Sequence, residues 1–268
     1  MNVRKYGEHP YRIAVIHGGP GAAGEMAIVA RYLSHHYGIV EPMQTAVTVQ
    51  GQIEELAEIL VKETDKPAIL IGYSWGAWLS IPVAARYIDL IHSLILVSAG
   101  PFEEKYASVF KNRMKRLTSK EQQEVFDIIK IMNDPDRSEK DLAFKKFGEF
   151  MGKTDIYNPG PDLRRDDDML FCNPDIFTRI WNEAAKLRES GELIKICSQI
   201  RCLVIAIHGD YDPHPAKGVN IPLSTIIPEF WFILLEHCGH CPWMEAEAKE
   251  RFFSILVDEL SGMVSSSL

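Results

Sequence analysis

The chain lacks any long hydrophobic run. Among its 268 residues the longest apolar stretches, such as 68–71 and 203–207, have the length of β-strands. A membrane-spanning helix needs about 18 or more apolar residues. The first residues, MNVRKYGEHPYR, are polar and contain no segment typical of a secretory signal. We therefore expect a cytoplasmic protein that has no membrane partner.

Cysteine is scarce and irregularly spaced. An odd number of cysteines without an export signal predicts reduced thiols rather than a disulfide framework. One C-x-x-C pair lies between two histidines, a spacing that also occurs in zinc sites. No second pair accompanies it, so we expect no metal and no cofactor. The five cysteines are Cys172, Cys197, Cys202, Cys238 and Cys241.

An excess of positive charge is missing too. The net charge is −8, and the resulting field repels phosphate backbones. The strongest basic run, at 111–116, is short and has the spacing of one helix face. We therefore expect no nucleic-acid partner and infer a small molecule or short peptide as the substrate. The sequence leaves the oligomeric state open.

Strand-like and helix-like segments alternate over the first hundred residues and again after residue 200. This alternation predicts an α/β fold with a mostly parallel sheet that helices cover on both faces. The predicted strands are 12–16, 68–71, 94–98, 202–207 and 231–235. The predicted helices are 25–34, one that contains Ile53, Leu56, Ile59 and Leu60, 78–87, and a last one at about 245–260.

Between residues 102 and 193 the pattern changes to helices with almost no strand signal. The predicted helix starts are Thr118 with Glu121, Ser138 with Asp141, and Asn173 before Pro174, and Gly191 is expected to end the last of these helices. We therefore expect one α/β core domain, formed by 1–101 and 194–268. A helical insertion of domain-sized length, 102–193, interrupts it.

The segment GYSWG at 72–76 directly follows a predicted strand and precedes a predicted helix. Strand, G-x-S-x-G and helix in this order are typical of the nucleophile elbow, a tight turn that projects the serine hydroxyl above the sheet. Glycines flank the serine because side chains there would collide with neighbouring backbone. The bare pattern arises by chance in about one chain in ten of this length, so its context matters.

Three further motifs supply that context. HGGPG at 17–21 ends the first strong strand, and its loop can offer a free backbone N–H. It is not a P-loop, because two alanines follow where such a loop needs Lys-Ser/Thr. HGDYDP at 208–213 and EHCGHCPWME at 236–245 each follow a strand. Carboxyl ends of parallel strands meet at one edge of the sheet, so a serine, an acid and a histidine are expected together there.

Together these motifs resemble those of α/β-hydrolase-fold serine hydrolases, and HGGPG is most similar to the proline iminopeptidase branch. The resemblance covers nearly all of the chain and implies that 102–193 is a helical cap. It implies Ser74 as the nucleophile, Asp212 as the triad acid and His240 as the base. It also implies that Gly19 and Trp75 supply the N–H groups of the oxyanion hole.

The motif loops contain competing residues. The family pattern G-x-x-D favours Asp212 over Asp210, which is expected to tighten its loop, and G-H-x-P favours His240 over His237. His214 is close enough in sequence to Asp212 to line the site, but a surface turn is favoured for it.

The resemblance implies cleavage of a small ester, thioester or amide through a covalent acyl-enzyme. A proline iminopeptidase-like aminopeptidase is the alternative, although the D-x-R-G-x-G-x-S stretch that those enzymes usually carry is missing from 38–56. Glu103, Glu104 or 166–168 would have to bind the free amino terminus. Ligand-binding or lyase chemistry is a further alternative, because fold does not determine reaction.

Overall fold

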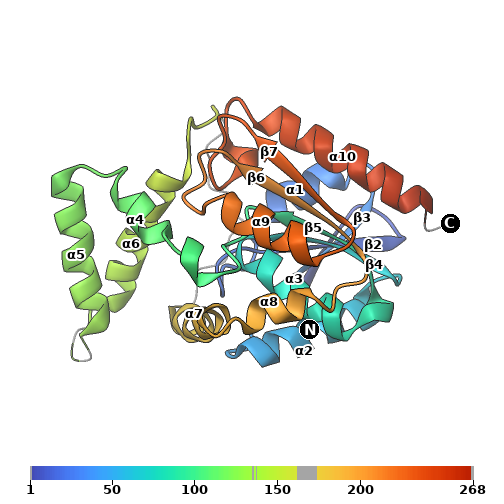
Figure 1. The fold of residues 1–268 in the computed structure, drawn as a ribbon, viewed down its shortest axis with the longest axis horizontal. Helices are drawn as coiled ribbons and strands as arrows, with labels where there is room; N and C mark the ends of the chain where they lie inside the picture. The colour runs from blue at the N-terminus through green and yellow to red at the C-terminus, as the bar shows by residue number, and fades with distance from the viewer. Residues whose placement is uncertain (1, 135, 137, 162–173, 267–268) are drawn as a thin grey trace.

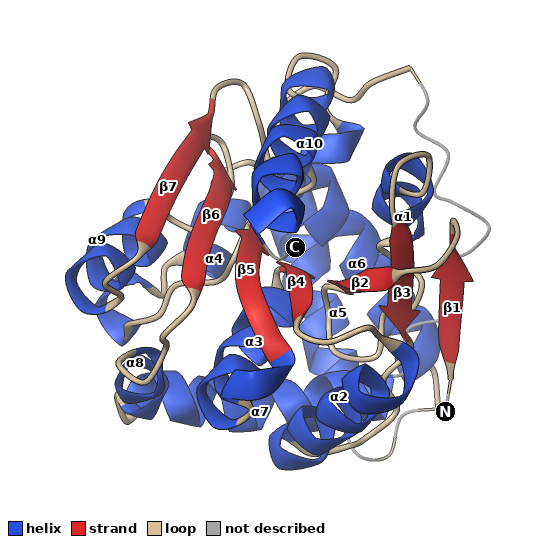
Figure 2. Ribbon diagram, turned by 90° about the vertical axis from the view of Figure 1, so that its right-hand side faces the viewer, coloured by secondary structure: helices blue, strands red, loops and turns tan. Residues whose placement is uncertain are grey.

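The structure, a computed structural model, describes residues 2–134, 136, 138–161 and 174–266. Within them lies a seven-stranded sheet in the order β1-β3-β2-β4-β5-β6-β7 (Figure 2). Its strands run parallel except β1, which pairs antiparallel with β3. The strands are β1 (Val3–Tyr6), β2 (Tyr11–Ile16), β3 (Gly38–Pro42), β4 (Ala68–Tyr73), β5 (Ile91–Val97), β6 (Leu203–Gly209) and β7 (Phe230–Leu235).

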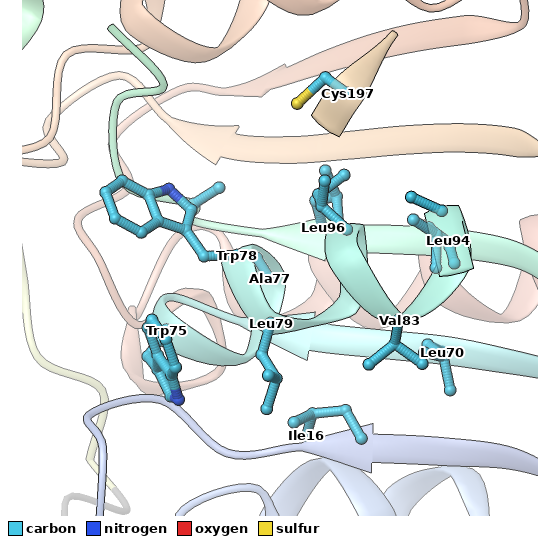
Figure 3. Close-up of a cluster of buried hydrophobic side chains, with 14 of the residues drawn as sticks. Ile16, Leu70, Trp75, Ala77, Trp78, Leu79, Val83, Leu94, Leu96 and Cys197 are labelled. Atoms are coloured by element: carbon cyan, nitrogen blue, oxygen red, sulfur yellow. The ribbon is translucent and has the colours of Figure 1, made fainter. Parts of the chain in front are cut away.

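Helices cover both faces of this sheet. Central strand β4 is buried throughout, and its alternate residues serve two cores: Leu70 packs on one face and Ile71 on the other. Figure 3 shows the first of these cores, where Val83 and Leu79 lie beside Leu70 and Ile16. This face is covered by α2 (Val49–Glu63), α3 (Trp75–Arg86), α8 (Glu192–Cys197) and α9 (Lys217–Ile226), and the other by α1 (Ala27–Leu33) and α10 (Lys249–Ser266).

Between β5 and α8 the described residues form helices joined by loops, and the strand pairing among them is an isolated bridge between Pro159 and Glu245. In Figure 1, α5 and α6 stand away from the sheet, whereas α7 lies next to α8. A small core that includes Met114, Val125 and Met151 joins the first three helices. The four α-helices described in this segment are α4 (Val109–Met114), α5 (Ser119–Asn133), α6 (Lys140–Asp155) and α7 (Pro174–Glu189). Short 3-10 helices lie at η1 (Ile88–Leu90), η2 (Glu104–Tyr106) and η3 (Pro242–Met244).

The predicted α/β architecture is confirmed, and so is the capping box of α5. The side chain of Thr118 accepts from the backbone N–H of Glu121, whose carboxylate accepts from the N–H of Thr118. The capping role of Ser138 is wrong, because α6 begins after Glu139 without a side-chain cap. The Asn173 prediction lies outside the described residues.

The sequence patterns do not predict strands β1 and β3 or helix α9, and the residues of these elements explain why. β1 (VRKY) is a polar edge strand, and β3 contains Glu41 and Pro42. α9 contains Gly218 and Pro222, both of which disfavour helices. In the part of the chain that the structure describes, no helix combines the length and the apolar character needed to cross a bilayer.

Candidate active site

Ser74 lies on a strained turn between β4 and α3. Its φ of 50° and ψ of −107° place a non-glycine residue in a strained backbone conformation. Such a conformation costs free energy and persists only where the surrounding structure enforces it. The surroundings do so: a Cβ at Gly72 would collide with the backbone of Gly76, and one at Gly76 would collide with the carbonyls of Ile16 and His17. The turn therefore needs both glycines, and it leaves Ser74 partly exposed.

The structure brings Ser74, His240 and Asp212 into one hydrogen-bonded chain. Nε2 of His240 lies 3.1 Å from Oγ of Ser74, and Nδ1 of His240 lies 2.8 Å from Oδ2 of Asp212. Asp212 and His240 are buried, whereas Ser74 is only partly buried. The three residues follow β4, β6 and β7, whose carboxyl ends meet at the same edge of the sheet.

Asp210 and His237, the competing residues of the two loops, make contacts outside this hydrogen-bonded chain. Asp210 accepts a hydrogen bond from the backbone N–H of Cys238 at 3.1 Å, so it braces the two loops against each other. His237 has a φ of 52° and stacks on Tyr157 with ring centroids 5.3 Å apart. Their geometry agrees with the expectation that Asp212 and His240, not these two, face Ser74.

The loop that carries His240 is held from two sides. The backbone N–H of His240 donates to the carbonyl of Asp155, at the end of α6, at 2.6 Å. The buried carboxylate of Glu245 accepts from the N–H groups of Gly239, Tyr157 and Asn158 at 2.7 to 2.9 Å. The last helix begins at Lys249, later than the predicted position near 245.

Charges in the site favour an ion pair between Asp212 and His240. Burial alone would raise the pKa of Asp212, but the positive charges that His240, His214 and His208 carry when protonated outweigh burial and hold that pKa well below its usual value. Burial alone would lower the pKa of His240, but the charge of Asp212 and the hydrogen bond to it raise that pKa above 6.5. An ionised Asp212 can therefore stabilise an imidazolium at His240.

His214 is not in a surface turn, so the expectation from the sequence is wrong. Its side chain is buried, and Nδ1 lies 2.8 Å from Oδ1 of Asp212, the carboxylate oxygen that His240 does not use. Its ring stacks on that of His240 with centroids 4.4 Å apart. The spacing of two residues from Asp212 was the available signal, but spacing does not reveal which way a side chain points.

The predicted oxyanion residues lie on either side of the serine turn. Trp75 is the first residue of α3, so its N–H has no carbonyl partner within the helix. A Cβ at Gly18 would meet the ring of Tyr73, which places the glycine loop directly against the turn, and Gly19 follows next. The N-terminal end of α3 adds a favourable field for negative charge at this position.

Aromatic side chains from the helical segment lie over the same loop. Phe177 of α7 lies 3.8 Å from the position that a Cβ at Gly19 would take. One turn further along, Trp181 approaches Trp75 with ring centroids 6.3 Å apart. Phe144 of α6 packs on Phe177. The surroundings of the serine turn on this side are therefore apolar.

The cysteine pair of the histidine loop is at least half-buried. Burial raises the pKa of both the Cys238 and Cys241 thiols. Among the described residues, the group of ligating side chains close enough to hold a metal ion is instead Asp212, His214 and His240. Hydrogen bonds between the carboxylate and the two imidazoles already account for that arrangement.

Comparisons with known proteins agree on one family. A model described as "Alpha/beta hydrolase family" matches residues 15–254. The mouse protein "Monoacylglycerol lipase ABHD6" is 26% identical over 233 residues, which cover 85% of this chain and 66% of that protein, just under two thirds. "Lipase 1" of Psychrobacter immobilis is 25% identical over 254 residues, or 87% of this chain and 72% of that protein.

The fold has close counterparts among solved structures. The crystal structure of VinJ superposes with a TM-score of 0.71 at 19% identity and covers 97% of this chain and 94% of that one. The mostly parallel sheet flanked by helices is therefore the α/β-hydrolase fold.

Proposed function

Because the chain belongs to the alpha/beta hydrolase family, we propose that it is a serine esterase that cleaves a small carboxylic ester through a covalent acyl-enzyme. The observation that carries this proposal is the hydrogen-bonded chain from Ser74 through His240 to Asp212. In this proposal Ser74 is the nucleophile, His240 the general base and Asp212 the acid that orients the base.

Acylation uses each of these groups once. His240 takes the proton from Ser74 as Oγ attacks the ester carbonyl, and Asp212 stabilises the imidazolium that forms. The N–H groups of Trp75 and Gly19 bind the developing oxyanion, and each such donor contributes about a hundred- to thousandfold in rate. The imidazolium then returns its proton to the departing alcohol. Water, activated by His240, releases the acid in a second pass.

The apolar surroundings of the turn and the names of the relatives favour an ester with an apolar acyl group. The matching proteins of mouse and Psychrobacter are named lipases, and Phe177 and Trp181 make the surroundings of Gly19 and Trp75 apolar. We propose that 102–193, which carries these aromatics, acts as a cap over the site.

An aminopeptidase would need a free carboxylate for the substrate's amino group. Glu103 pairs with Lys105 at 2.9 Å, and Glu104 pairs with Arg188 at 2.7 Å. Both candidates that the structure describes are thus engaged by the chain's own cations, and 166–168 lie outside the described residues. The ester assignment is therefore the stronger one.

The test is intact-mass analysis after treatment with a fluorophosphonate, with wild type beside Ser74→Ala. We expect one adduct on wild type and none on the variant, whose circular dichroism should be unchanged. A panel of p-nitrophenyl esters from acetate to octanoate, a thioester and a prolyl-arylamide then ranks the substrates. Turnover by Ser74→Ala would refute the nucleophile, and a rate on the arylamide without one on esters would favour the aminopeptidase.

A further inference from the structure

Asp212 carries two imidazoles, one on each carboxylate oxygen. Oδ2 faces Nδ1 of His240 at 2.8 Å, and Oδ1 faces Nδ1 of His214 at 2.8 Å. Oδ1 also accepts from the backbone N–H of His214 at 2.8 Å. The triad of the proposed mechanism uses one oxygen of this carboxylate, so the contacts on the other oxygen call for a role of their own.

The protonation of His214 follows from its neighbours. An ionised carboxylate can only accept hydrogen bonds, so Nδ1 of His214 must carry a proton. Burial lowers the pKa of His214 to about 4, although Asp212 opposes this. At neutral pH, His214 is therefore an uncharged imidazole with its proton on Nδ1. It donates to Asp212 without adding a positive charge beside His240.

His214 is itself held in place. Its carbonyl accepts a hydrogen bond from Nε2 of His208, at the end of β6, at 2.8 Å. Its side chain is 6% exposed, and its ring lies 25° from the plane of the His240 ring. His208 of β6 and the stacked ring of His240 thus fix the His214 side chain. Because it is fixed, its hydrogen bond can hold the carboxylate of Asp212 in one orientation.

We propose that His214 is a positioning residue for the triad, an inference that rests on the proposed function. Its two hydrogen bonds to Oδ1 hold the carboxylate so that Oδ2 faces His240, and they draw negative charge away from Oδ2. His214 thereby sets both the orientation of the base and the pH range in which the base is neutral.

The charge effect has a definite sign. A carboxylate that loses a donor on Oδ1 holds more negative charge at Oδ2, which stabilises the imidazolium of His240 and raises its pKa. Because His240 must be neutral to take the serine proton, activity would then begin at higher pH. The other titratable and charged groups facing this cluster are His208 from β6, Arg113 from α4, Asp155 from α6, Tyr73 from β4 and Cys241 from the histidine loop.

The experiment compares His214→Leu with His214→Asn. The Asn side chain can place an N–H close to the position of the histidine Nδ1, whereas Leu has similar bulk and no donor. Both variants keep the backbone N–H and every other charged group. The measurement is kcat/KM for p-nitrophenyl butyrate from pH 5 to 9, with the rate of fluorophosphonate labelling over the same range as a second readout.

For His214→Leu we expect kcat/KM to fall about tenfold or more. We also expect the acid limb of its profile of kcat/KM against pH to move up by about half a pH unit or more. His214→Asn should restore the limb to within about 0.2 pH units of wild type and most of the rate. Labelling should follow the same limbs, because it needs the same neutral base. Fluorophosphonate titration of active sites corrects for any unfolded fraction.

An acid limb in His214→Leu that stays in place or moves down, after that correction, would overturn the inference. A rate loss shared equally by both variants would do the same, because it indicates a merely structural role. Failure of the proposed function itself has a different signature, since wild type would then neither be labelled nor turn over esters.

Discussion

At the scale of single residues, the site depends on which atoms carry protons. Asp212 is buried and ionised among three histidines, and the positive charge that it stabilises forms on His240. A neutral amide at this position would present an N–H donor to one of the imidazoles and favour the wrong tautomer of His240.

Asp212→Asn is therefore expected to lower kcat by about a thousand- to ten-thousandfold, with a smaller effect on KM. Steady-state kinetics on a p-nitrophenyl ester measures this. The matched control is Asp210→Asn, which changes the neighbouring carboxylate that only braces Cys238. Equal losses in the two variants would remove Asp212 from its proposed role.

At the scale of elements, helix α4 holds the loop that carries Asp212. Nδ2 of Asn112 donates to the carbonyl of Pro213 at 2.9 Å, and the guanidinium of Arg116 donates to the carbonyl of Tyr211 while it stacks on the Tyr211 ring at 3.7 Å. Asn112 belongs to α4 and Arg116 lies just after its end, and the two side chains bind the carbonyls on either side of Asp212. The helical segment thus contacts the triad loop directly.

Asn112→Leu is expected to lower kcat about three- to tenfold, because the carbonyl of Pro213 loses its donor and the loop gains freedom. The melting temperature should fall by only a few degrees, which corresponds to about 1 kcal/mol. Lys111→Leu, an exposed change on the same helix, serves as the control. A full rate in Asn112→Leu would show that α4 does not position the loop.

At the scale of the whole molecule, buried histidines link stability to pH. Burial lowers the pKa of His17 and of His214 to about 4. The unfolded chain binds protons at these positions below about pH 6.5, whereas the folded chain does not bind them until about pH 4. Their contribution to stability is therefore fully present above pH 6.5 and is lost as pH falls toward 4. His240, whose pKa is raised, acts in the opposite sense.

As pH falls from about 6.5 to about 4, we expect each of the two histidines to reduce the free energy of unfolding by about 1.4 kcal/mol per pH unit. His17→Leu removes one of them, so its stability relative to wild type should rise by about 2 to 3 kcal/mol between pH 7 and pH 4.5. Urea unfolding at both pH values measures the difference. A difference between His17→Leu and wild type that stays the same at the two pH values would contradict the assignment.

The sequence by itself determined the features that depend on short-range sterics and periodicity. The buried strand before GYSWG, the glycine that the serine turn needs at Gly72, and the capping box of Thr118 all follow from residues near one another in the chain. These rules act over a few residues, so they identify the α/β architecture and the serine turn without any knowledge of distant contacts.

The tertiary structure alone decided which side chains meet. Local patterns offered two aspartates and two histidines, and the register of β6 on β7 brings Asp212 and His240 together while Asp210 and His237 take other contacts. Such choices depend on distances between strands that are far apart in the chain, and no local pattern encodes those distances.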